Sequence, residues 1–125
     1  MIYPELHYGR DALVGMALFL SHLAECGLKC SELRNSYPEY HISKNKISLA
    51  PGTDIQRIFS SIRSKFGGYK INDADGLKID FEYGWVHLRT SNTEPIMRIY
   101  AEGRTEEEAA DYAGLVIKEI SSEGC

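Results

Sequence analysis

Several features that would assign a chain to a broad class are missing from these 125 residues. No apolar run reaches the roughly 18 residues that a membrane-spanning helix needs, so a membrane partner is not expected. The formal charge of −4 argues against nucleic-acid binding, because domains with that function usually carry a basic excess. No basic segment precedes a short apolar run with a cleavage site, so secretion is not indicated.

Cysteine is also scarce. The chain has three cysteines, Cys26, Cys30 and Cys125. This odd number and their spacing do not fit a disulfide framework. No histidine lies near Cys26 and Cys30 at a zinc-finger spacing, so a structural zinc site is not expected. The scattered histidines are interpreted as surface residues or as residues with satisfied partners: His7, His22 and His41. We therefore expect reduced thiols in a cytoplasmic protein.

The composition that is present is typical of a globular protein, with 43% apolar and 26% charged residues. The length suits one domain of usual size, with room for a small appendage. Near the start, an apolar run from Ala12 to Ala24 predicts a helix with Asp11 as N-cap and Gly27 just past its end. This helix is apolar on most faces and needs cover from more than one side. It either packs on the following domain or is separated from a larger one, and the second interpretation is favoured.

Residues 28–45 are polar and are interpreted as a connector, with residues 41–43 and 46–49 forming a strand or a bent strand pair. In the next segment, five apolar residues recur at helical spacing from Ile55 to Phe66 and predict a helix with one apolar face. Beyond residue 69 the period changes to two, which predicts strands separated by turns, including one at Asp73–Gly76. Thr105 and Glu108 form a capping-box pattern at the start of a last amphipathic helix.

This order predicts an α+β fold: a two-layer sandwich with a mostly antiparallel four-stranded sheet, covered on one face by two helices. If the alternation holds, the uncovered face is polar and carries the following side chains: Lys78, Asp80, His87, Arg89, Arg98 and Tyr100.

The stretch Arg89-Thr90-Ser91-Asn92-Thr93-Glu94-Pro95 lies between two predicted strands and is rich in anion-binding groups. A guanidinium binds phosphate or carboxylate bidentately, and hydroxyls and backbone N–H groups complete an anion cradle. Arg98 places a second positive charge nearby. From composition alone, a polar hairpin loop with ordinary turn residues explains the same stretch.

The same loop, followed by Ile96-Met97-Arg98-Ile99-Tyr100-Ala101-Glu102, resembles the phosphate-binding signature of the α-D-phosphohexomutase superfamily. That superfamily includes phosphoglucomutases, phosphomannomutases and phosphoglucosamine mutases. The resemblance covers nearly the whole of this chain, but it corresponds to only about the last quarter of a full mutase. It implies a TATA-binding-protein-like C-terminal domain over residues 41–125. Residues 1–40, with the segment Tyr8–Ala12 and its helix, resemble the end of the preceding, third domain and a linker.

The family shuttles a phosphoryl group between an active-site phosphoserine and a hexose phosphate. The resemblance implies that the C-terminal domain holds the phosphate that is not being transferred. The residues implied to contact it are Arg89, Ser91, Asn92 and Thr93, with Arg98 as a further partner. Glu94 is expected to shape the loop, because its charge would repel an anion.

Other family signatures are not found in the sequence. It has no serine in the nucleophile motif, no Asp-x-Asp-x-Asp run for Mg²⁺ and no sugar-recognition loop. The resemblance thus implies a phosphoserine and Mg²⁺ for a full-length enzyme, and no catalytic residue, metal site or cofactor in this chain. We expect an inactive C-terminal fragment whose partners are a phosphosugar and the upstream domains, and Met1 is interpreted as a start residue supplied by cloning.

Several residues keep two interpretations. His87 either lines the phosphate site or is a surface residue, while Trp85, Tyr83 and Tyr100 either stack on a sugar or pack in the core or at a domain interface. The Tyr37–Tyr40 segment is a candidate hinge. Two other functions are retained as alternatives: a non-catalytic docking or oligomerisation module that uses the polar sheet face, and an RNA-binding sheet, which the acidic charge disfavours.

Overall fold

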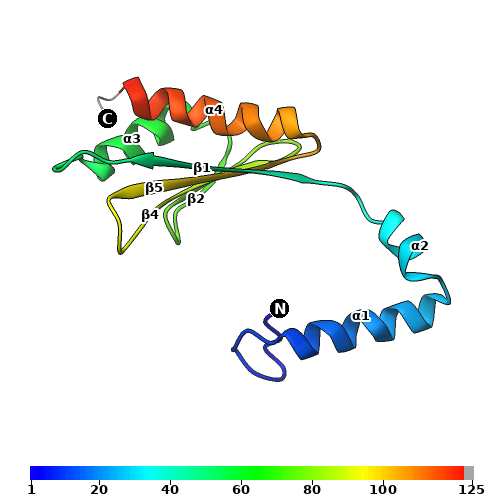
Figure 1. Ribbon diagram of the computed structural model, residues 1–125. Coiled ribbons are helices and arrows are strands. Elements are labelled where there is room, and N and C mark those ends of the chain that lie inside the picture. The colour runs from blue at the N-terminus through cyan, green and yellow to red at the C-terminus, as the bar shows by residue number, and fades with distance from the viewer. Residues whose placement is uncertain (123–125) are drawn as a thin grey trace. The chain divides into compact units, whose positions relative to one another are not determined.

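The computed structural model describes residues 1–122 (Figure 1). The chain divides into two compact units, Met1–Pro38 and a second unit that begins at Glu39. The assignment of residues 1–40 to a preceding domain and of residues 41–125 to a phosphate-binding domain stays a prediction. Within the described residues, no helix is both long and apolar enough to cross a membrane.

The first unit begins its regular structure with α1 (Ala12–Cys26), which confirms the predicted helix and extends it by two residues. Asp11 caps the helix by accepting a hydrogen bond from the backbone N–H of Val14 at 3.0 Å. Gly27 ends it in the left-handed conformation. No residue of α1 is buried, and Leu13 is 73% exposed. The first unit therefore does not supply the cover that this apolar helix needs.

A second helix, α2 (Cys30–Asn35), lies within the segment interpreted as a connector, where no helix was predicted. Two local interactions account for the helix. The Glu32 carboxylate accepts a hydrogen bond from the backbone N–H of Lys29 at 2.8 Å, and Leu33 is buried. Lys29, Glu32 and Leu33 are close together in the sequence, but a helix of 6 residues is too short to be recognised by its periodicity.

The second unit is built on an antiparallel sheet with strand order β1-β5-β4-β3-β2. Its strands are β1 (His41–Ser48), β2 (Lys70–Asn72), β3 (Leu77–Asp80), β4 (Trp85–Thr90) and β5 (Ile96–Gly103). The sheet has five strands rather than the predicted four, and the short strand expected near residues 69–71 is β2, which pairs with β3 at one edge. Residues 41–48 form one continuous strand that pairs with β5 along its whole length, so no bent pair exists there.

Two helices cover one face of this sheet, α3 (Ile55–Lys65) and α4 (Glu106–Ser122), as Figure 1 shows. The α+β two-layer sandwich is thereby confirmed. Asp54 caps α3 and Thr105 caps α4, each by accepting a hydrogen bond from a backbone N–H three residues on. The buried core has contributions from both helices and from the strands. It comprises Ile58, Phe59 and Ile62 of α3 with its C-cap residue Phe66; Leu77, Ile79, Val86, Leu88, Met97, Ile99 and Ala101 from the strands; and Ala113, Val116 and Ile120 from α4.

The uncovered face of the sheet is polar, as the alternation predicted. In β4 and β5 the buried residues alternate with half-buried or exposed ones, so His87, Arg89, Arg98 and Tyr100 lie on the face away from the helices. Lys78 and Asp80 extend this face onto β3, where they form an ion pair with each other. The helices need only one apolar face of the sheet, which leaves the other available for a ligand or a partner.

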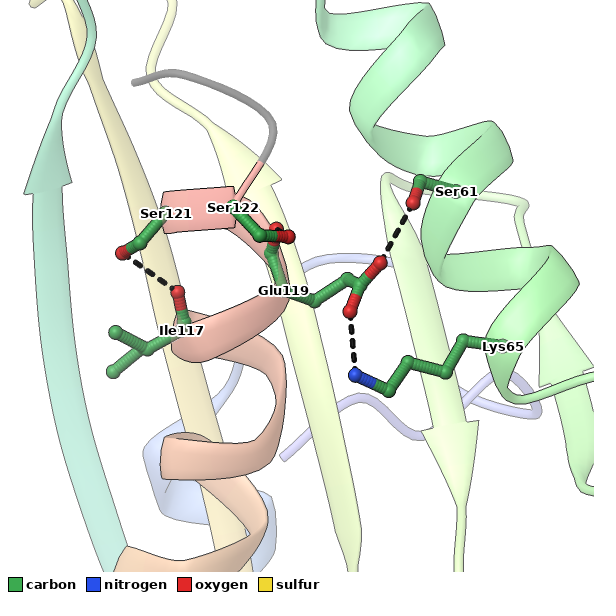
Figure 2. A network of polar contacts seen from close by, with 6 residues as sticks. All are labelled: Ser61, Lys65, Ile117, Glu119, Ser121 and Ser122. Atoms are coloured by element: carbon green, nitrogen blue, oxygen red, sulfur yellow. Dashed lines mark hydrogen bonds and ion pairs between the residues drawn. The ribbon is translucent and has the colours of Figure 1, made fainter.

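The two helices are joined by a polar contact at their ends. Figure 2 shows Glu119 of α4 between two side chains of α3: its carboxylate accepts hydrogen bonds from Ser61 Oγ at 2.8 Å and from Lys65 Nζ. The hydrogen bond from Lys65, followed by that from Ser61, lowers the pKa of the Glu119 carboxyl below its ordinary value. Because the folded state favours the ionised carboxylate, this contact stabilises the fold only while Glu119 is charged.

We expect Glu119→Gln to lower the melting temperature at neutral pH and to lose this effect in acid. Since the folded-state pKa is depressed, the stabilisation is present above the unfolded-state pKa of about 4.3 and disappears as pH falls through the folded-state pKa. Thermal unfolding of both proteins from about pH 7 to about pH 3 measures this. Asp111→Asn, on an exposed position of α4, is the control. A melting-temperature difference that stays constant across this range would contradict the assignment.

Candidate anion-binding site

The loop singled out in the sequence, residues 89–95, is the connection of the β4–β5 hairpin. The backbone N–H of Ser91 donates to the carbonyl of Ile96 at 2.9 Å and closes the hairpin. On the other side, the backbone N–H of Leu49 donates to the carbonyl of Pro95 at 2.8 Å, which ties the loop to the end of β1. The loop is therefore held from two directions and presents its tip at one edge of the sheet.

Arg89 and Arg98 lie directly opposite each other on β4 and β5. Both side chains are about half exposed, at 54% and 49%, and both are on the uncovered face of the sheet. Two like charges opposite each other on neighbouring strands repel, so this arrangement is unfavourable without anions nearby. Two carboxylates offset this repulsion: Asp75 Oδ2 lies 3.2 Å from Arg89 Nη1, and Glu94 Oε2 lies 3.9 Å from Arg98 Nη2.

The hydroxyl groups of the loop are divided between the two faces. Ser91 Oγ lies 3.4 Å from Thr93 Oγ1, and the backbone N–H of Thr93 points to Ser91 Oγ at 3.4 Å. These two hydroxyls are thus clustered at the tip, where Asn92 is exposed. Thr90 lies opposite the buried Met97, on the helix-covered side. Thr90 does not join the cluster, which consists of the hydroxyls of Ser91 and Thr93.

The tip also offers backbone donors. Among the described residues, none accepts a hydrogen bond from the backbone N–H groups of Asn92 and Glu94. Exposed N–H groups in a tight loop bind anions well because they are fixed in direction. Together with the guanidinium groups and the two hydroxyls, they give the hairpin a set of donors suited to an anion.

Two hollows mark the uncovered face beside this loop. The smaller, of about 100 Å³, is lined by His87, Arg89, Arg98 and Tyr100. The larger, of about 540 Å³, shares Arg98 and Tyr100 and is bounded by Lys44, Lys46, Glu94 and neighbouring residues. The loop thus borders a recessed surface with positive charge on several sides.

Lys44 and Lys46 were not identified from the sequence as site residues. They join the site because β1 pairs with β5, which places Lys46 opposite Arg98 and Lys44 opposite Tyr100. Lys46, Arg98 and Arg89 therefore form a row of three cations across three strands. Only the strand register reveals this row, since Lys46 is distant from the loop in sequence.

Asp75 was also missed, although its turn was predicted. The turn between β2 and β3 lies against β4, and His87 Nε2 donates to the backbone carbonyl of Asp75 at 2.6 Å. This contact gives His87 a structural role at the rim of the site. It also places the Asp75 carboxylate beside Arg89.

Trp85 and Tyr100 lie on the sheet, and Tyr83 lies in the turn between β3 and β4. Trp85 Nε1 donates to Glu102 Oε1 at 2.9 Å, and the Arg104 guanidinium lies 3.5 Å from the centre of the Tyr83 ring. These contacts occupy the indole N–H of Trp85 and one face of the Tyr83 ring. Tyr100, which is 36% exposed, is the aromatic side chain that borders both hollows beside the loop.

The remaining histidines each have a polar neighbour. His7 Nε2 lies 3.0 Å from Asp11 Oδ2, His41 Nδ1 lies 3.9 Å from Glu106 Oε1, and the His22 ring contacts Cys26 Sγ at 3.6 Å. Cys26 and Cys30 are free thiols, while Cys125 lies outside the described residues. Within residues 1–122, no group of three or more His, Cys, Asp or Glu side chains is placed to hold a metal ion.

Comparison with known proteins decides the family. The sequence model of the phosphoglucomutase/phosphomannomutase C-terminal domain matches residues 44–119. The chain belongs to this family. The matched segment starts within β1 and ends within α4, so it contains the whole hairpin and both arginines. The resemblance inferred from the loop motif is thereby confirmed.

Similar proteins are considerably longer than this chain. It is 38% identical over 120 residues to a phosphoglucomutase/phosphomannomutase of Thermococcus kodakarensis, covering 94% of this chain and 26% of the relative. It is 36% identical over 107 residues to a phosphoglucosamine/phosphogalactosamine mutase of Sulfurisphaera tokodaii, covering 84% of this chain and 24% of the relative. The chain therefore spans about a quarter of the length of these relatives.

A solved structure shows the same fold. The crystal structure of a phosphoglucomutase/phosphomannomutase family protein from Burkholderia thailandensis aligns with a TM-score of 0.50 at 22% identity. The alignment covers 73% of this chain and 20% of that one.

Proposed function

We propose that the β4–β5 hairpin and the adjacent sheet face bind the phosphate group of a hexose phosphate. The observation that carries the proposal is the position of Arg89 and Arg98, opposite each other on an exposed sheet face at the base of a loop rich in donors. The family match supports the proposal, because relatives with this domain are named as mutases of phosphorylated hexoses and hexosamines.

Each residue has a distinct role in the proposed site. Arg89 offers a planar fork that matches two phosphate oxygens, and Arg98 adds a second fixed charge. Ser91 and Thr93 donate hydroxyl hydrogens, while Asn92 offers its carboxamide and backbone N–H at the exposed tip. One dianion between the two guanidinium groups also offsets the repulsion between them.

We further propose that the chain is the C-terminal part of a phosphohexomutase, an isomerase that transfers phosphate within its substrate. In that enzyme the domain would hold the phosphate that is not being transferred. Mg²⁺ and a phosphoserine would supply charge neutralisation and the phosphoryl group. The described residues do not form the site for that metal. On this proposal upstream domains in the cytoplasmic enzyme provide both groups, and the chain alone binds phosphosugar without transferring phosphate.

The test is an amide NMR titration of the 125-residue chain with a hexose bisphosphate. We expect saturable shifts confined to residues 89–98 and to the neighbouring ends of β1 and the β2–β3 turn. The affinity is expected to be weak because one hairpin offers few contacts. Shifts scattered over the surface would contradict phosphate binding at this loop. Self-association that is indifferent to phosphate would instead support a docking or oligomerisation module.

A further inference from the structure

The carboxylate of Asp75 takes the position that a bound anion would take at Arg89. Asp75 Oδ2 lies 3.2 Å from Arg89 Nη1, within the range of an ion pair. A second carboxylate, Glu94, lies beside Arg98 on the other strand. Two guanidinium groups thus face two carboxylates, and their formal charges sum to zero without a ligand.

The main chain holds Asp75 in place independently of this ion pair. His87 Nε2 donates to the Asp75 backbone carbonyl at 2.6 Å, and the backbone N–H of Ala74 donates to Asn72 Oδ1 at 2.9 Å. The following residue, Gly76, has φ 80° and lies against the Leu88 carbonyl so closely that an added Cβ would be 2.1 Å from its oxygen. The turn therefore presents Asp75 to Arg89 from a fixed position.

We infer that Asp75 is an internal counter-ion for Arg89, and that a phosphate dianion binds by displacing it. This inference rests on the proposed phosphate-binding function and adds a residue that sets the affinity of the site. Both side chains are more than half exposed, at 54% and 65%, so water can solvate the released carboxylate and the exchange costs little. In the empty site the carboxylate offsets the repulsion between Arg89 and Arg98.

The exchange favours anions of charge −2. A phosphate monoester carries a charge of about −1.5 to −2 at neutral pH, so it brings more negative charge to the two guanidinium groups than the single Asp75 carboxylate that it displaces. A singly charged anion replaces one carboxylate without a net gain of charge. Asp75 thus lowers the affinity of the site for every anion and leaves the doubly charged phosphate as the ligand best able to compete.

The experiment combines a matched pair of variants with a direct measurement on the unaltered chain. Asp75→Asn removes the counter-ion, while Asp73→Asn removes the same charge from the same turn, where it pairs with Arg63 at 3.0 Å instead. With inorganic phosphate at constant ionic strength, we expect Asp75→Asn to bind about two- to fivefold more tightly than the wild-type chain, the factor that one exposed ion pair is worth. Asp73→Asn should change the affinity less. In the wild-type chain, the carboxyl carbon resonance of Asp75 should move with the same dissociation constant as the amides of residues 89–98, while that of Asp73 stays in place.

The outcomes separate this inference from the function on which it rests. If phosphate shifts the amides of residues 89–98 but leaves the Asp75 carboxyl unmoved, or if both variants gain affinity equally, the counter-ion exchange is wrong and the phosphate site stands. Weaker binding by Asp75→Asn would also overturn it, because the carboxylate would then orient Arg89 for the ligand. If phosphate leaves residues 89–98 unchanged in every protein, both the site and the exchange are wrong.

Discussion

Arg89→Ala is expected to weaken binding of a hexose phosphate by about ten- to a hundredfold, the range for losing a hydrogen bond to a charged group. Arg89 is the residue of the loop motif that combines full charge with a planar fork, and it lies at the border of the smaller hollow. Its removal leaves Arg98 as the neighbouring guanidinium on β5. Isothermal titration calorimetry or amide shifts measured against a hexose bisphosphate give the dissociation constants directly.

Two further variants separate geometry from charge. Arg89→Lys keeps the positive charge but loses the bidentate fork, so its affinity should fall between those of the wild-type chain and Arg89→Ala. Arg63→Ala removes an equal charge from α3, on the helix side of the sheet, where Arg63 pairs with Asp73. It should bind nearly as well as the wild-type chain. Equal losses in Arg89→Ala and Arg63→Ala would show that only the net charge matters and would contradict a specific site.

Gly76→Ala is expected to be among the most destabilising single changes in the chain. Gly76 has φ 80°, a left-handed conformation that costs a residue with a side chain about 1–2 kcal/mol. In addition, its Cβ would lie 2.1 Å from the Leu88 carbonyl oxygen, which belongs to a central strand and cannot move aside without disturbing the sheet. We expect a total loss of about 3 kcal/mol or more, measured by chemical denaturation of the sheet-containing unit.

Gly52→Ala is the matched control for this effect. Gly52 has φ 87°, but no atom lies within 4 Å of its added Cβ, so the substitution adds the backbone cost without the steric clash. It should lose about 1–2 kcal/mol. Equal losses at the two positions would mean that the turn does not pack against β4 as described. Since this turn carries Asp75, a displaced turn in Gly76→Ala should also change the amide resonances around Arg89.

The parts of the fold that could be predicted from the sequence are those specified by local periodicity. The apolar stripe from Ile55 to Phe66 predicted α3, and the alternation in β4 and β5 assigned Arg89 and Arg98 to the uncovered face. Both patterns depend only on the geometry of a single element. The short helix α2 escaped prediction because 6 residues do not complete enough periods to be recognised, whereas the short strand expected near residues 69–71 is present as β2.

The candidate site also has residues that the sequence predicted and residues that only the structure revealed. The loop motif identified Arg89, Ser91, Asn92 and Thr93, because all are adjacent in sequence. Lys46 and Asp75 reach the site through strand pairing and through a turn that folds back onto β4. Strand order and register are set by how all the elements pack together, so one segment does not reveal them. Whether the five predicted site residues bind phosphate stays a prediction.

The most direct test of the account is a crystal structure of the 125-residue chain with a hexose bisphosphate. The account predicts one phosphate group on the uncovered sheet face, with its oxygens bound by the guanidinium groups of Arg89 and Arg98 and by the donors of residues 91–93. A phosphate bound elsewhere, with these arginines still paired to Asp75 and Glu94, would contradict it.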